Sequence, residues 1–114
     1  MSFQSRFKDQ YNDELFEAIL QLKDIEECYQ FFEDICTIKE LQSISQRLQV
    51  AKLLKKGKTY IEIEKETGAS TATISRVNRC LHYGSDGYKL AMERLESIKK
   101  EDKEETAEEN KQNA

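Results

Sequence analysis

Residues 59–82, TYIEIEKETGASTATISRVNRCLH, decide the fold. They predict a short helix over 59–66, a tight turn, and a second helix over 71–82, which is the helix-turn-helix pattern. Gly68 stands where a left-handed turn residue is needed, and Ser70 can cap the second helix. The apolar residues fall where two steeply crossing helices would bury them, at Ile63, Ala69, Ile74 and Val77.

The outer face of the second helix predicts contact with DNA. Small hydroxyl and methyl groups at its start allow close approach to base edges and thymine methyls, and a helix N-terminus favours phosphate. Basic side chains around this face would bind the DNA backbone. The predicted DNA-binding residues are Lys52, Lys56, Lys58, Ser70, Thr71, Ala72, Thr73, Ser75, Arg76 and Arg79.

The charge distribution favours the same region. The net charge is −4, but residues 1–46 hold 4 Lys/Arg against 10 Asp/Glu, whereas residues 47–82 hold 8 against 3. Because salt screens charges over about 8 Å, distant acidic groups do not cancel the local potential of a docking face. The middle third of the chain is therefore compatible with a polyanionic partner.

The rest of the chain predicts further helices. Proline is absent, and three pairs match the capping-box pattern at a helix start: Asp24 with Glu27, Thr37 with Glu40, and Thr59 with Glu62. Apolar residues recur at helical spacing over residues 15–22, 25–35, 41–54 and 88–98. The sequence therefore predicts an all-α fold, with the central helix ending near Gly57.

The domain organisation follows from length and composition. We expect a flexible N-terminal arm over residues 1–12, one helical DNA-binding domain over 13–98, and a charged, disordered tail over 99–114. A domain of this size buries only about two thirds of its unfolded surface. A second copy of the chain is therefore expected to complete the core.

Other classes of function have little support. No run of about 18 apolar residues and no leader are present, so we expect a cytoplasmic protein without a membrane partner. The cysteines, Cys28, Cys36 and Cys80, lack metal-binding spacing, and His82 is the only histidine. We expect reduced, buried thiols, no metal site, no catalytic residues and no enzymatic activity. The alternative is a protein-interaction module that has a helix-turn-helix shape but does not read DNA sequence.

Residues 13–95 resemble the Trp repressor superfamily, and in particular its YerC/YecD branch of TrpR-like bacterial proteins. The closest segments are ISQRLQVAKLLKKGKTYIEIEKETGASTATISR (44–76) and FFEDICTIKEL (31–41). The resemblance implies a Trp-repressor-like bundle of about six helices and an intertwined homodimer. Two recognition helices would then read a palindromic operator in successive major grooves about 34 Å apart. It implies a transcriptional regulator, in the simplest case a repressor, bound to the bacterial nucleoid.

The resemblance also implies a candidate ligand pocket. Thr37 and Arg76 match the residues that hold a ligand carboxylate, and Arg47 matches an arginine that stacks on an indole. However, Val77 replaces a glycine and Cys80 a serine, so branched methyls would intrude on the indole slot and a thiol would be a poor acceptor. We therefore expect no bound cofactor and disfavour tryptophan. Another amino-acid-like effector stays open, as does a purely structural role for Thr37 as a helix cap.

Overall fold

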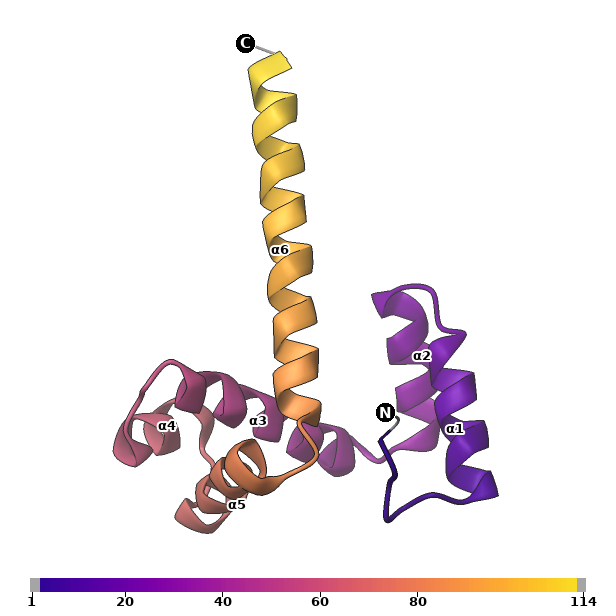
Figure 1. Ribbon diagram of the computed structural model, residues 1–114, viewed down its shortest axis with the longest axis vertical. Helices are drawn as coiled ribbons and strands as arrows, with labels where there is room; N and C mark the ends of the chain where they lie inside the picture. The colour runs from indigo at the N-terminus through magenta and orange to yellow at the C-terminus, as the bar shows by residue number, and fades with distance from the viewer. Residues whose placement is uncertain (1–2, 113–114) are drawn as a thin grey trace. The chain divides into compact units, whose positions relative to one another are not determined.

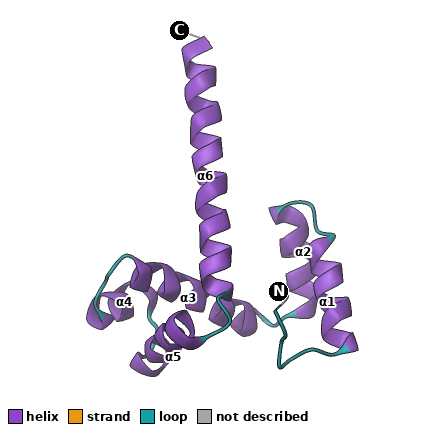
Figure 2. Cartoon of the chain, viewed as in Figure 1, coloured by secondary structure: helices purple, strands orange, loops and turns teal. Residues whose placement is uncertain are grey.

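The computed structural model describes residues 3–112, within which the chain forms six α-helices and no strand (Figure 2). The ends of the expected arm and tail, residues 1–2 and 113–114, lie outside the described residues. The chain divides within its third helix into two compact units, one up to Gln42 and one from Ser43 onward. The all-α prediction is confirmed.

The first unit contains α1 (Gln10–Leu20), α2 (Ile25–Ile35) and the start of α3. Asp9 and Asp24 cap α1 and α2, because their carboxylates accept hydrogen bonds from the backbone N–H groups three residues further on. Neither helix has a buried residue. Large apolar side chains stay exposed, at Phe16, Leu20, Ile25, Tyr29 and Ile35. These helices therefore have no core of their own in a single chain.

The second unit contains most of α3 (Ile38–Lys55), with α4 (Tyr60–Thr67), α5 (Thr71–Tyr83) and α6 (Gly87–Gln112). In Figure 1, α4 and α5 lie below α3, and α6 rises from its other side. All four helices and the turn between α4 and α5 contribute to one core, made of Val50, Ala51, Leu53, Ile63, Ala69, Ile74, Val77 and Met92. The four apolar residues predicted to be buried in the helix-turn-helix are all in this core, each at most 1% exposed.

Both ends of α3 confirm the sequence signals. The Glu40 backbone N–H donates to Thr37 Oγ1 at 3.1 Å, and the Thr37 N–H donates to Glu40 Oε1 at 2.9 Å. The hydrogen bond from the Thr37 N–H lowers the pKa of the Glu40 carboxyl below its usual value, and the Thr37 hydroxyl lowers it by a smaller amount. After α3, Gly57 adopts a left-handed φ of 82°, and the Lys58 N–H donates to the Leu53 carbonyl at 3.1 Å. These bonds satisfy carbonyls that the helix leaves free.

Residues 99–112 continue α6 as a helix, which differs from the disorder expected for residues 99–114. The expectation rested on the near absence of apolar side chains. Glu and Lys are nevertheless good helix formers. Because α6 is already formed where Met92 packs in the core, elongation through this segment needs no new nucleus. A packed helix can thus extend through a segment that could not fold alone.

The expected N-terminal arm overlaps α1, which begins at Gln10 and is capped by Asp9. Asn12 Nδ2 donates to the Phe7 carbonyl at 2.7 Å, and the Lys8 ammonium pairs with the Asp13 carboxylate. The Arg6 guanidinium lies 4.7 Å from the centre of the Phe7 ring. Residues 6–8 are therefore held against the start of α1 by local contacts.

The cysteines differ from the expectation of buried thiols. All three are free, but Cys28 and Cys80 are exposed and only Cys36 is half-buried. α2, which contains Cys28, has no buried residue, and Ile74 and Val77 are the only buried residues of α5, which contains Cys80. Among the described residues, no helix is long and apolar enough to cross a membrane.

Candidate nucleic-acid interface

The turn between α4 and α5 has the left-handed residue that the sequence predicts. Thr59 and Glu62 form a capping box at the start of α4. At its end, Gly68 has a φ of 74°, and its N–H donates to the Glu64 carbonyl at 2.9 Å. A Cβ built on Gly68 would meet no atom within 4 Å. The backbone conformation, and not a lack of space, therefore explains the glycine.

Hydrogen bonds from Thr67 and Gln46 fix this turn further. The Thr67 hydroxyl donates to the Ile63 carbonyl at 2.7 Å and accepts from the Ala69 N–H at 3.1 Å. Gln46 Nε2, on α3, donates to the Thr67 carbonyl at 3.1 Å. This bond ties the central helix to the turn. Sequence reasoning missed Gln46, although a polar residue four positions before the buried Val50 was a usable signal.

Ser70 is the N-cap of α5, as predicted. Its Oγ accepts from the Thr73 N–H at 3.2 Å, and its hydroxyl donates to Thr73 Oγ1 at 3.1 Å. Other N–H groups in the first turn of a helix have no partner within the helix. The first turn of α5 has no acidic residue. The positive end of the helix dipole is therefore not neutralised locally, and it suits a phosphate oxygen.

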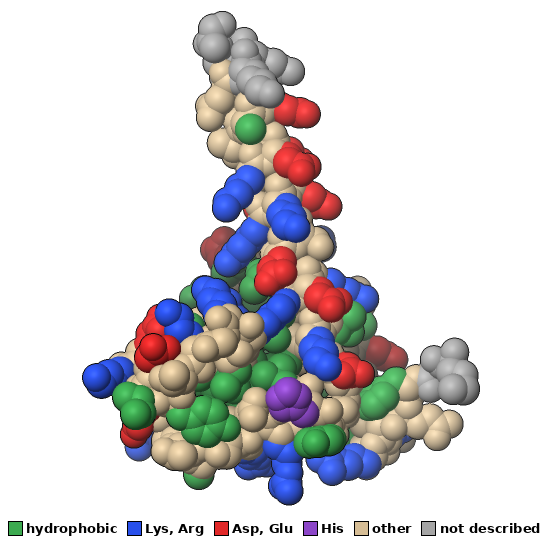
Figure 3. Space-filling view, turned by 60° about the vertical axis from the view of Figure 1, so that its left-hand side comes forward, with side chains coloured by type: hydrophobic (Ala, Val, Ile, Leu, Met, Phe, Trp, Pro, Cys, Tyr) green, Lys and Arg blue, Asp and Glu red, His purple; other side chains and the backbone are tan. Residues whose placement is uncertain are grey.

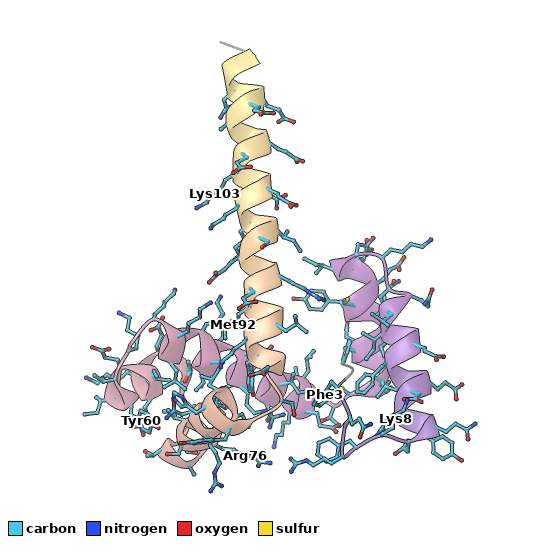
Figure 4. The ribbon with its side chains drawn as sticks, in the orientation of Figure 1. Phe3, Lys8, Tyr60, Arg76, Met92 and Lys103 are labelled. Atoms are coloured by element: carbon cyan, nitrogen blue, oxygen red, sulfur yellow. The ribbon has the colours of Figure 1, made fainter. Side chains whose placement is uncertain are left out.

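The outer side of α5 combines small side chains with two guanidinium groups. Ile74 and Val77 face the core, whereas Arg76 and Arg79 are exposed. Figure 4 shows Arg76 pointing away from the core, and Figure 3 shows basic side chains at the foot of this unit. An open hollow of about 600 Å³ lies on this side of the helix, lined by Ala72, Ser75, Arg76 and Arg79.

We call this side of α5 the reading face, formed by Thr71, Ala72, Ser75, Arg76 and Arg79. The helix-turn-helix brings these five predicted DNA-binding residues together on one exposed surface. Thr73 is half-buried, and its hydroxyl is held by Ser70. The structure therefore gives Thr73 a part in the helix cap, and its contact with a base stays a prediction.

The three predicted lysines are not grouped with the reading face. Lys58 is exposed in the loop between α3 and α4. Lys52 and Lys56 line a cleft between α3 and α6. The sequence predicts these lysines around the outer face of α5, as contacts to the DNA backbone. Helix periodicity instead turns them towards α6, so their contact with the DNA backbone stays a prediction.

The three candidate ligand-pocket residues belong to different units. Thr37 caps α3 in the first unit, whereas Arg47 on α3 and Arg76 on α5 are in the second. Arg47 is half-buried and Arg76 exposed. The pocket itself stays a prediction. No group of three or more His, Cys, Asp or Glu side chains suitable for a metal ion occurs among the described residues.

Comparison with known proteins gives consistent matches. The sequence model of the Trp repressor protein family matches residues 10–96. YerC of Bacillus subtilis (strain 168), an uncharacterized protein, is 61% identical over 89 residues, which cover 78% of this chain and 86% of YerC.

Two solved structures are also similar. A proposed Trp repressor from Staphylococcus aureus is 57% identical with a TM-score of 0.77, covering 80% of this chain and 91% of that one. A TrpR-like protein from Eubacterium eligens ATCC 27750 is 59% identical with a TM-score of 0.76, covering 79% and 93%. The family match ends at residue 96, so the last two thirds of α6 lie beyond it.

Proposed function

The chain belongs to the Trp repressor family, and on that premise we propose that it is a sequence-specific DNA-binding transcriptional regulator. It acts as a homodimer on a palindromic operator in the cytoplasm, in the simplest case as a repressor. The observation that carries this proposal is the reading face, an exposed surface of small and guanidinium side chains on the second helix of a helix-turn-helix. The family is one of regulators and not of enzymes.

The residues of the reading face differ in the part of the DNA that they would contact. Thr71, Ala72 and Ser75 are small enough for the helix to enter the major groove and place hydroxyl and methyl groups against base edges. Arg76 and Arg79 are exposed on the same face and carry the charge that binds phosphate oxygens or guanine. Occupancy of an operator by such a helix would block transcription from an overlapping promoter.

The exposed apolar side chains of the first unit support the homodimer. Leu20 is 78% exposed and Ile25 76% exposed, and neither α1 nor α2 has a buried residue. Exposed apolar side chains along two helices without a buried residue are typical of surface that another protein chain covers. A second copy would cover these helices and add a second reading face by two-fold symmetry. Two reading faces related in this way match an inverted repeat.

The experiment that tests DNA binding is a salt titration of duplex affinity. Fluorescence anisotropy with a labelled duplex between about 50 and 200 mM salt should show affinity falling steeply, because cations are released from the DNA. Arg79→Gln should reduce the slope of log affinity against log salt by about 1. Lys39→Gln makes a similar charge change in the first unit and should leave the slope unchanged.

A flat salt response for the wild-type protein would contradict the proposal. It would favour the alternative, a helix-turn-helix-shaped module that binds another protein. An equal change of slope in Arg79→Gln and Lys39→Gln would show that the reading face has no special part in binding.

A further inference from the structure

A second basic surface lies between the end of α3 and the first half of α6. It is a cleft of about 210 Å³. Met92 and Leu95 of α6 supply its apolar wall, and four lysines surround it: Lys52 and Lys55 of α3, Lys56 directly after α3, and Lys99 of α6. We call this the lysine cleft. In Figure 4, Met92 lies at the base of α6, on the opposite side of the unit from Arg76.

The charge of the lysine cleft is largely uncompensated. Glu96 is the single acidic residue in its lining, and its carboxylate lies 3.5 Å from Lys55 Nζ. Over residues 3–112, the structure shows no ion pair for Lys52, Lys56 or Lys99. Four ammonium groups against one carboxylate give the cleft a net charge of +3. A bound anion would compensate this positive charge.

Helix-dipole stabilisation accounts for only part of this cluster. Lysines near the end of α3 interact favourably with the negative end of the helix. However, the Gly57 and Lys58 N–H groups already bind the Leu54 and Leu53 carbonyls. Lys99 lies in the middle of α6 and has no helix end nearby. The dipole therefore does not explain why lysines from two helices converge on one apolar cleft.

Helix geometry separates the lysine cleft from the reading face. Gln46 lies on the side of α3 that contacts the turn of the helix-turn-helix. Lys55 follows it by nine residues, which at 3.6 residues per turn places it on the opposite side of α3. The same spacing separates Leu90 from Lys99 on α6. Lys99 therefore lies on the side of α6 opposite to the exposed Leu90.

We propose that the lysine cleft is a binding site for a small organic anion, with a phosphate or carboxylate group attached to a compact apolar body. The anionic group lies among the lysine ammonium groups, and the apolar body packs on Met92 and Leu95. This pairing of charge and apolar surface is typical of small-molecule sites. The site differs from the pocket predicted at Thr37, Arg47 and Arg76, and it does not depend on DNA binding.

The test uses a reporter that the sequence provides. Met92 is one of only two methionines, the other being Met1. Protein labelled with ¹³C at its methionine methyls therefore gives one signal from the cleft. On titration with phenyl phosphate, the Met92 signal should shift and saturate, with a Kd on the order of 1 mM for a ligand of about 11 non-hydrogen atoms. Inorganic phosphate and neutral benzyl alcohol should each bind at least about fivefold more weakly.

Matched lysine variants test where the anion binds. Lys55→Gln with Lys99→Gln should weaken phenyl phosphate binding about fivefold, since each exposed lysine contributes modestly. Lys23→Gln with Lys39→Gln removes the same charge from the first unit and should leave binding unchanged. Equal weakening in both double variants would overturn the site.

Three other results would also overturn the proposal. A Met92 signal that does not respond to phenyl phosphate would exclude the site. Equal binding of benzyl alcohol would exclude a role for the lysines, and equal binding of inorganic phosphate would exclude a role for the apolar wall. A response to duplex DNA alone would assign the cleft to the DNA backbone.

Discussion

Substitution of Gly68 tests whether the turn between α4 and α5 has the left-handed backbone that places α5. Gly68 has a φ of 74°, and an added Cβ would meet nothing within 4 Å. Gly68→Ala therefore introduces backbone strain of about 1–2 kcal/mol without a steric clash. Alanine also lowers the conformational entropy of the unfolded chain, which raises the free energy of unfolding by about 0.4–1 kcal/mol. The net expected loss in the free energy of unfolding is about 1 kcal/mol.

Gly87→Ala is the matched control for this substitution. Gly87 begins α6, its φ is not in the left-handed region, and an added Cβ meets no atom within 4 Å. The same chemical change should therefore stabilise the protein there by about 0.4–1 kcal/mol. Gly68→Asn should cost less than Gly68→Ala, because asparagine tolerates the left-handed region.

Urea unfolding followed by circular dichroism measures all three variants. Protein concentrations must be matched, because the stability of a dimer depends on them. A loss above about 3 kcal/mol for Gly68→Ala would mean that the added methyl clashes. No loss, or a gain as in Gly87→Ala, would mean that the turn is not left-handed. Either result would refute the reasoning.

Three further predictions concern caps and subunit contacts. Ser70→Ala should lower the free energy of unfolding by about 1 kcal/mol through loss of the α5 cap, whereas Ser43→Ala, at an exposed site on α3, should change it by less than about 0.5 kcal/mol. Tyr29→Glu should shift the protein from dimer towards monomer in sedimentation experiments, because it places a charge on apolar surface that the second copy of the proposed homodimer would cover; an unchanged dimer would contradict this. The lowered pKa of Glu40 means that its ionised form stabilises the fold above the ordinary carboxyl pKa, and this contribution is lost as pH falls through the lowered value. Carboxyl NMR should show Thr37→Val raising that pKa part of the way back, and an ordinary pKa in both proteins would exclude the cap's effect.

The helix-turn-helix could be predicted because its signals are local. The turn glycine, the cap at Ser70 and the buried Ile63 and Ile74 all lie within 24 consecutive residues. Each of these residues indicates a backbone conformation or the buried face of one helix, and neither inference requires contacts that are distant in sequence. The bond from Gln46 to the Thr67 carbonyl spans 21 residues and depends on how α3 packs against the turn. The spacing from Val50 indicates that Gln46 faces inward, but no local pattern specifies Thr67 as its partner.

Two other features required more than local patterns. Lys52 and Lys56 are near the helix-turn-helix in sequence, but the position of α6 decides which surface they line. The apolar residues of α1 and α2 correctly indicated amphipathic helices, yet they stay exposed in a single chain. Their spacing predicts that one face of each helix is buried, but it does not specify whether the same chain or a second chain covers that face.

Selection of duplexes from a random pool tests whether α5 reads DNA sequence. The purified protein would be used at about 150 mM salt with no ligand added, so that nonspecific phosphate contacts are weak. A homodimer with two reading faces should enrich an inverted repeat with half-sites about 10 base pairs apart, one for each reading face. Failure to enrich any sequence, in a protein that still binds as a dimer, would contradict sequence-specific reading by α5.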